Sequence, residues 1–228
     1  MSFKTTFALS AVAFSLGSAA QDGAIYEVDP ASGKLTDLGA TFMADAVIAE
    51  GAVAFDFNNQ IDAVRAVGAD GSNLVYFPQG FGDNDERANS VRRFTDAFYV
   101  AGDMSAGSDP VIFANAYTNA IAGTKAGSTA QYALDAGANA LVTLANNAGE
   151  LASVGNLSIE GATVDVSDWG GFDIVSPEEG KDMAYAILQI EGAETAGLYA
   201  VDLGTGALTE MADLAMGGFT GFAVAQAQ

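Results

Sequence analysis

Four short polar side chains in this sequence could supply oxygen ligands for a cation. Ca²⁺ is a hard ion that takes about 6 to 8 oxygen ligands with loosely constrained geometry, so carboxylate and amide oxygens suit it. No loop with the D-x-[DN]-x-[DN]-G spacing of a calcium site is present. The alternative is that these side chains accept hydrogen bonds from backbone N–H groups at strand ends and turns. The four candidates are Asp56, Asn58, Asn119 and Asp173.

A second candidate site is basic. Arg87, Arg92 and Arg93 follow an oxygen-rich run, Asp-Asn-Asp-Glu at residues 83–86. Three of the eight Lys and Arg residues therefore lie within seven positions. One hypothesis is a docking patch for the acidic surface of another copy or of another partner, because complementary charges steer association. The alternative is a solvated loop in which neighbouring charges neutralise one another with little energetic effect.

Chemistry that needs imidazole or thiol groups is excluded, because the chain has no His and no Cys. This removes the ordinary Ser-His-Asp triad, cysteine nucleophiles and zinc sites built from these ligands. No phosphate-binding loop, nucleophile elbow or dinucleotide fingerprint occurs either. A pair of carboxylates or an all-oxygen metal site remains available for hydrolysis. The 29 Asp and Glu residues give no reason to single out one pair.

The composition is that of a folded, strongly acidic protein. The 228 residues carry a formal charge of minus 21, and half of them are apolar. This length suffices for one domain with a sizeable core. The acidity repels phosphate backbones and anionic headgroups, so nucleic acid and membrane surfaces are disfavoured as partners. Cations and basic partners are compatible with it, as is the alternative that the charge only keeps the protein soluble.

The first 20 residues are typical of a secretory signal peptide. One positive charge, Lys4, precedes an apolar stretch at residues 7–16 and a small-x-small sequence, Ser-Ala-Ala, at residues 18–20. This apolar stretch is about half as long as the roughly 20 residues that a membrane anchor needs. We predict that residues 1–20 are removed on export. Residues 21–228 then form one domain, without membrane insertion, in the periplasm or outside the cell.

Short alternating apolar runs, bounded by Gly, Asn, Asp or Pro, predict an all-β chain. The only tryptophan, Trp169, is expected in the core, where it gains most by burial, with stacking on sugar rings as the alternative. Arg65 is expected to form a buried ion pair with Asp62 or Asp56. Residues 136–145 fit either a helical turn or a hairpin. The predicted strands are residues 24–28, 53–57, 74–77, 111–117, 185–190, 198–201 and 219–224.

Two distant segments of the chain share one pattern. The sequence [IL]-Y-x-V-D-x-x-[ST]-G-x-L-T at residues 25–36 recurs at residues 198–209, and a weaker copy spans residues 131–143. In the two clear copies, Asp29 and Asp202 are expected to fold back on a turn in which Gly33 and Gly206 take positive φ. We interpret both aspartates as structural.

This similarity predicts a β-propeller. The tyrosine pattern alternates with a second pattern, which occurs at residues 55–58, 116–119, 171–174 and, last in the chain, 221–224. The order predicts four blades, with five as the other option, in a ring that closes when N- and C-terminal strands pair in one blade. The four candidate oxygen ligands would then converge on the axial channel. The alternative fold is a β-sandwich with fortuitous internal similarity.

Four motifs in fixed order resemble the DUF4394 domain family, bacterial exported proteins of unknown function. They are D-F-N at residues 56–58 with D-A-V-R at residues 62–65, D-G-S-N-L at residues 70–74, A-Y-T-N at residues 116–119 and G-F-D-I at residues 171–174. The resemblance covers roughly residues 24–224. It implies architecture and export, and it adds no reaction.

These observations favour an exported, non-enzymatic protein for binding or surface assembly, with an unknown ligand. Calcium is the one cofactor that the residue types suggest. The first alternative is a calcium-dependent hydrolase or lyase with its site at the axial channel. The second is a self-assembling extracellular coat or filament subunit. Self-association and a basic or cationic partner both remain open.

Overall fold

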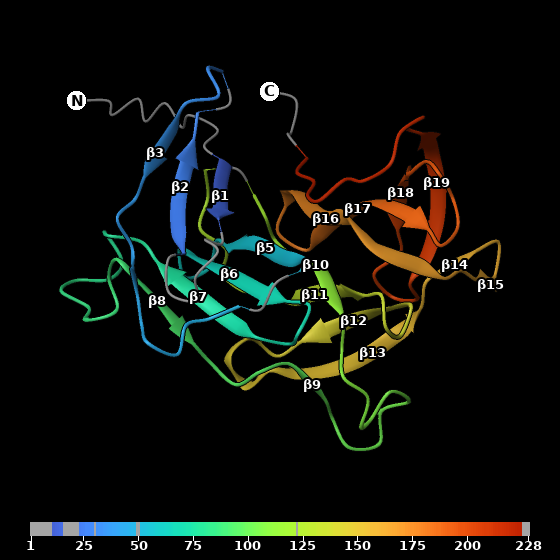
Figure 1. Cartoon of the computed structure of the whole chain (residues 1–228), viewed down its shortest axis with the longest axis horizontal. Coiled ribbons are helices and arrows are strands. Elements are labelled where there is room, and N and C mark those ends of the chain that lie inside the picture. The colour runs from blue at the N-terminus through green and yellow to red at the C-terminus, as the bar shows by residue number, and fades with distance from the viewer. Residues whose placement is uncertain (1–10, 16–22, 30, 49–50, 122, 225–228) are drawn as a thin grey trace.

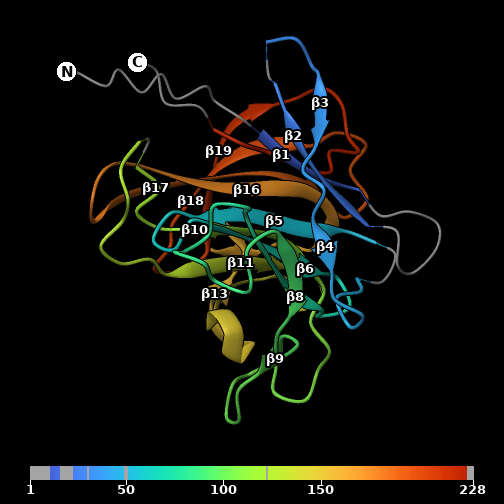
Figure 2. The same cartoon turned by 90° about the vertical axis from the view of Figure 1, so that its left-hand side faces the viewer.

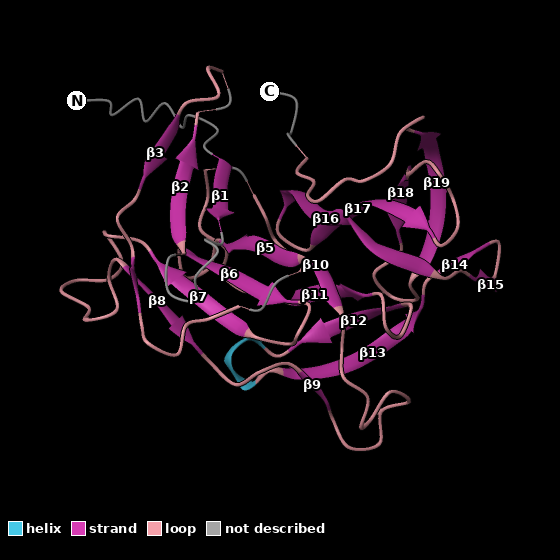
Figure 3. Ribbon diagram, viewed as in Figure 1, coloured by secondary structure: helices cyan, strands magenta, loops and turns pink. Residues whose placement is uncertain are grey.

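The computed structural model describes residues 11–15, 23–29, 31–48, 51–121 and 123–224. Within these ranges the chain is built from strands, and the one helix is the 3-10 turn η1 (Asn146–Ala148) (Figure 3). Among the same residues, no helix has the length and apolar character needed to span a bilayer.

The strands form four open sheets, which we call sheets I to IV (Figure 1). Sheet I is antiparallel, and each of the others contains one parallel pair. Sheet I has the order β1 (Ala11–Ser15), β2 (Ala24–Val28), β3 (Leu35–Asp37). Sheet II has the order β4 (Thr41–Phe42), β8 (Ser90–Arg93), β7 (Asn73–Phe77), β6 (Ala63–Gly68), β5 (Val53–Asn58).

Sheets III and IV contain the C-terminal half of the described chain. Sheet III has the order β10 (Ile112–Tyr117), β11 (Gln131–Asp135), β12 (Ala140–Leu144), β13 (Glu150–Asn156), β9 (Phe98–Tyr99). Sheet IV has the order β15 (Ala162–Thr163), β14 (Ser158–Ile159), β19 (Ala207–Asp213), β18 (Gly197–Val201), β17 (Lys181–Ile190), β16 (Val166–Glu178).

Most predicted strands are confirmed. Six of the seven predicted segments lie in β2, β5, β7, β10, β17 and β18, and residues 136–145 form a hairpin turn followed by β12. The apolar runs predict these strands because at least one face of each packs in a core, and β7 and β10 are buried on both faces, while the bounding Gly, Asn and Asp residues turn the chain.

The two turns predicted from the shared pattern are confirmed. Gly33 N–H donates to Asp29 O and Gly206 N–H donates to Asp202 O, at 2.7 and 2.8 Å. Both glycines have positive φ, 68° and 77°. In each turn an aspartate Oδ1 also accepts from a backbone N–H two residues further along. The aspartates are therefore turn residues, as the sequence indicates.

The propeller prediction is wrong. The four sheets remain open, and β2 pairs with β1 and β3 rather than with a C-terminal strand. Residues 219–224 form no strand and pair with no part of sheet I. Instead they lie along β16, where an ideal Cβ added to Gly171 would be 2.5 Å from Phe222 N. The predicted N- to C-terminal pairing, and with it the axial channel, is absent from the described chain.

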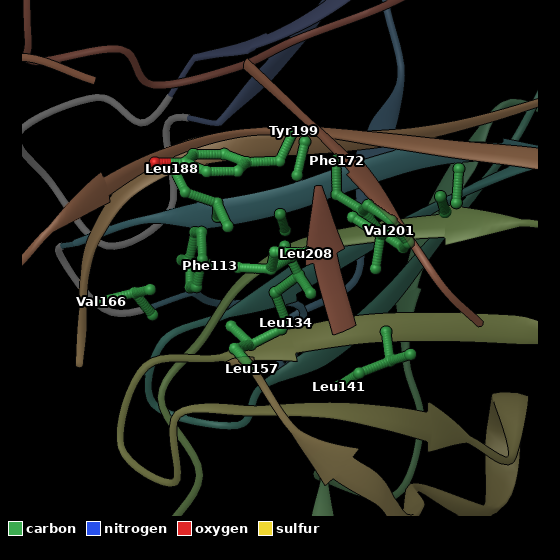
Figure 4. Close-up of a cluster of buried hydrophobic side chains, with 14 of the residues drawn as sticks. Phe113, Leu134, Leu141, Leu157, Val166, Phe172, Leu188, Tyr199, Val201 and Leu208 are labelled. Carbon is green, nitrogen blue, oxygen red and sulfur yellow. The ribbon is translucent and has the colours of Figure 1, made fainter. Parts of the chain in front are cut away.

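Three of the four hydrophobic clusters formed by the described residues lie between two sheets. The largest joins sheets III and IV through side chains such as Phe113, Leu134 and Phe172 (Figure 4). A second joins sheets II and III, and a third joins sheets I and II. None of the clusters formed by the described residues joins sheet I to sheet IV, which agrees with the absence of a closed ring.

Candidate functional site

The predicted cation ligands lie around one place in the fold, where β10 packs against both β5 and β16 (Figure 1, Figure 2). We call this place the strand junction. In the part of the chain that the structure describes, these three are the end strands of sheets III, II and IV, so each has one edge without a ladder partner there. Side chains and backbone groups from three sheets therefore meet there.

Asp56 lies on β5 at the strand junction and bonds across to sheet III. Its Oδ2 accepts a hydrogen bond from Tyr117 N–H at 2.7 Å, across a sequence separation of 61 residues. Burial, followed by repulsion from the Asp173 carboxylate, raises the pKa of Asp56 to about 8, and backbone N–H bonds oppose this rise. Asp56 is therefore in large part protonated at neutral pH.

Asp173, on β16, binds the C-terminal segment. Its Oδ2 accepts from Val224 N–H at 2.6 Å, and its Oδ1 accepts from Ile174 N–H at 2.8 Å. Burial raises the pKa of Asp173 above its ordinary value, and these two backbone donors counteract the rise. The carboxyl group accepts a hydrogen bond from a segment that forms no strand, which is the structural alternative to cation binding.

The two candidate asparagines also have partners. Asn58 Oδ1 accepts from Gln60 N–H at 3.0 Å, as in a local turn. Asn119, just after β10, has positive φ, and its Oδ1 accepts from Gly180 N–H at 2.6 Å. Its backbone N–H donates to Asp182 Oδ1 at 2.7 Å. Asn119 therefore connects sheet III to the β16–β17 turn.

The structure thus brings Asp56 and Asp173 close enough to repel each other, whereas the oxygens of Asn58 and Asn119 serve neighbouring groups. In the described ranges, no three or more Asp, Glu, His or Cys residues are grouped as metal ligands would be. The calcium site with Asp56, Asn58, Asn119 and Asp173 remains a prediction.

A buried arginine network lies beside the strand junction. Arg65, on β6, is 3% exposed, and its guanidinium donates to Tyr117 Oη at 2.9 Å and to Asn73 Oδ1 at 2.5 Å. The other two bonds go to Asn146 O at 3.3 Å and to Asn147 Oδ1 at 2.8 Å. We call these residues the Arg65 network.

The prediction of an ion pair for Arg65 is wrong. None of the ion pairs between described residues includes it, and Asp62 instead pairs with Lys125 at 2.9 Å. All four acceptors of Arg65 are neutral oxygens. Burial raises the pKa of Tyr117, and the Arg65 charge offsets part of this rise. The phenol is therefore a neutral partner that fixes the cation between two sheets.

Asn115, on β10, was not singled out from the sequence. Its cross-strand partner Ala133 packs with Ala54 and Val67 of sheet II, so Asn115 lies on the face of sheet III toward sheet II. It is 1% exposed, and neither atom of its amide has a hydrogen-bond partner among the described residues. Its one sequence signal is a polar residue between alanines in an apolar strand.

The three arginines of the predicted docking patch lie in or beside β8 and have local partners. Arg87 forms a bidentate pair with Asp85 at 2.9 and 2.7 Å, and its guanidinium lies 4.9 Å from the Phe77 ring centroid. Arg92 bonds to Glu86 O at 2.9 Å, and Arg93 bonds to Asp96. Their side chains are a quarter to two fifths exposed. Docking through this patch remains a prediction.

A comparison with protein families agrees with the motifs. The family described as "Domain of unknown function (DUF4394)" matches residues 8–223, nearly the whole chain. The chain belongs to this family. No curated protein matches the sequence significantly. The DUF4394 match begins within the predicted signal peptide and includes β1, which pairs with β2 along five residues.

Proposed function

We propose that this DUF4394 protein is an exported, non-enzymatic binding protein whose β-sheets form a rigid support for surface contacts. The observation that carries the proposal is that buried or half-buried polar side chains at and beside the strand junction bond to distant parts of the chain. Asp56, Asp173 and Arg65 each bond to backbone or side-chain groups more than 50 residues away. A catalytic acid or base must be within hydrogen-bond reach of a substrate proton, whereas these groups face protein partners.

Export is part of this proposal. Its support is the order of Lys4, the apolar stretch at residues 7–16 and the small residues at 18–20. The strong acidity and the lack of cysteine are compatible with work outside the cytoplasm. Export to the periplasm or beyond would also place the protein's surfaces where they can contact other exported or surface molecules.

The second candidate is a calcium-dependent hydrolase or lyase. It is favoured by the repulsion between the Asp56 and Asp173 carboxyls, which a cation at the strand junction would relieve. Such an ion would lower the pKa of Asp56 and make both carboxylates available as ligands. Under the first proposal, a proton on Asp56 relieves the repulsion instead.

Two measurements separate the candidates. We expect the purified protein to turn over no member of a glycan, lactone and phosphoester panel at a rate that Asp56→Asn abolishes. We also expect the melting temperature to be the same in calcium and in a chelator. Turnover lost in Asp56→Asn but retained in the surface control Asp83→Asn would refute the non-enzymatic proposal. A calcium-dependent rise in melting temperature, absent in Asp56→Asn, would establish the ion site.

Surface assembly is the other form that binding could take. Under this form, light scattering detects large species that dissolve when Arg92 and Arg93 are replaced by Glu. The pairing of these arginines with Glu86 and Asp96 predicts instead that the double variant and the wild type scatter alike. Large wild-type species that are absent from the double variant would favour the coat or filament subunit.

A further inference from the structure

Trp169 is exposed on the surface of sheet IV, and its predicted core position is wrong. It lies in β16 and is 47% exposed. The register between β16 and β17 shifts between Val166 and Gly170, so three residues of β16 oppose a single residue of β17. This bulge turns the consecutive residues Asp168 and Trp169 outward. The only indole of the chain is therefore presented to solvent.

The indole rests on the C-terminal segment. An ideal Cβ at Gly218 would lie 3.7 Å from the Trp169 ring, and Gly218 has a φ of 76°. Gly218 N–H donates to Gln189 Oε1 at 3.0 Å, which fixes the segment against β17. Ser167 Oγ donates to Gln189 O at 3.2 Å and anchors the bulge from the other side. Trp169 thus has backbone support while about half of it faces water.

The C-terminal segment also carries a second exposed apolar side chain. Met216 is 59% exposed, and its backbone O accepts from Ala196 N–H at 2.8 Å. Gly217 packs so closely that an ideal Cβ would lie 2.7 Å from Glu194 O. The exposed Met216 is therefore two residues from Gly218, on which the indole rests, and lies beside the loop that follows β17.

The same surface is strongly acidic. Asp168 is exposed next to Trp169, and Glu191 and Glu194 are exposed in the bordering loop. The backbone N–H of Glu191 donates to the backbone O of Asp165 at 2.8 Å, so Asp165 lies beside this loop. Its exposed side chain is the fourth carboxylate. Residues 151–228 contain 12 Asp and Glu residues and one Lys, a net charge of minus 11. That lysine, Lys181, pairs with Glu178 beside the turn between β16 and β17.

We infer that this surface, the Trp169 patch, binds a basic peptide segment of a partner protein. The patch consists of Trp169 and Met216 with the carboxylates of Asp165, Asp168, Glu191 and Glu194. An indole face attracts an Arg or Lys side chain, and the surrounding carboxylates steer the rest of the segment. The inference rests on the proposed binding function and names the partner's chemistry.

Charge selects this occupant over two others. A neutral oligosaccharide would gain stacking on Trp169 but nothing from the carboxylates. A second copy of this chain brings a net charge of minus 21, and its partly exposed arginines Arg87 and Arg93 already pair with Asp85 and Asp96. A Lys- or Arg-rich segment satisfies both the indole and the carboxylates.

The test uses a fluorescein-labelled octa-arginine peptide and measures its anisotropy on the full exported chain. We expect Trp169→Ala to weaken binding about fivefold or more, and Trp169→Phe to weaken it less. Asp168→Asn should also weaken binding relative to wild type and lessen the salt dependence of the affinity. The matched control is Asp83→Asn, which replaces an exposed acid in the β7–β8 loop and should leave the affinity within about twofold of wild type. Because Trp169 is exposed, circular dichroism should show all variants folded.

Several outcomes would overturn the inference. Binding to Trp169→Ala within about twofold of wild type would mean that the peptide responds only to net charge. Quenching of Trp169 fluorescence by a neutral cello-oligosaccharide, without an effect of octa-arginine, would identify a sugar site. Either result would refute the basic-peptide inference and leave the proposed binding function standing. Turnover that is lost in Asp56→Asn would instead refute the proposed non-enzymatic function and leave the Trp169 patch standing, since octa-arginine binding is measured separately.

Discussion

Replacing Asp56 with Asn should change how the stability of the protein depends on pH. The pKa of Asp56 is about 8 in the folded protein and near 3.8 when the side chain is free of its surroundings. Between these values the folded chain holds a proton that the unfolded chain releases. Linkage then requires the free energy of unfolding to fall as pH rises through about 4 to 8. The amide introduced by Asp56→Asn cannot ionise, so the variant lacks this contribution.

The magnitude follows from the pKa difference. Each unit corresponds to about 1.4 kcal/mol, so a carboxyl wholly withdrawn from water would contribute about 5 to 6 kcal/mol. Asp56 is half-buried, and solvent screening reduces the expected contribution to about 2 to 4 kcal/mol. The amide oxygen of Asn retains an acceptor for Tyr117 N–H, so the hydrogen bond at 2.7 Å can persist. The variant should match wild type near pH 4, exceed it by a growing margin as pH rises, and reach the full difference near pH 8.5.

The assay is urea unfolding followed by far-UV circular dichroism from pH 4 to 9, with chelator present to exclude bound cations. Asp173 has a raised pKa and adds a slope of the same sign, so the wild-type minus variant difference reports Asp56 together with its coupling to Asp173. The control Asp83→Asn should run parallel to wild type. Curves for Asp56→Asn and wild type that stay parallel within about 0.5 kcal/mol would refute the assigned electrostatics of the strand junction.

Three other changes test separate parts of the structure. Arg65→Met should lower the free energy of unfolding by about 3 to 5 kcal/mol, because it leaves buried acceptors unpaired. The control Arg92→Met, at a partly exposed arginine, should lower it by less than about 1 kcal/mol. Equal urea midpoints for the two variants would contradict the buried network. Gly206→Ala should destabilise the protein by about 2 kcal/mol more than Gly33→Ala does. Both positions have positive φ, but only a Cβ at Gly206 would meet two carbonyl oxygens at 2.9 Å. A lower melting temperature for Gly33→Ala than for Gly206→Ala would contradict this packing. Mass spectrometry of the exported protein should find Gln21 at its N-terminus, and an intact leader would remove the support for export.

The local features of this fold could be predicted from the sequence because each is decided within a few residues. The turn at Asp29 and Gly33 and that at Asp202 and Gly206 use one side-chain acceptor and one positive φ, and both form as expected. Alternating apolar residues located six strands. The absence of His and Cys excluded whole classes of chemistry before any fold was known.

The arrangement of these elements was decided by competition between distant partners, which local patterns do not contain. Residues 219–224 had the alternation of a strand, yet they form no strand and lie along β16, where Asp173 takes Val224 N–H. Arg65 bonds to neutral oxygens 8 to 82 residues away rather than to Asp62, three positions away. A register shift in β16 turned Trp169 outward. In each case the outcome depends on which groups long-range packing brings within hydrogen-bond or van der Waals distance.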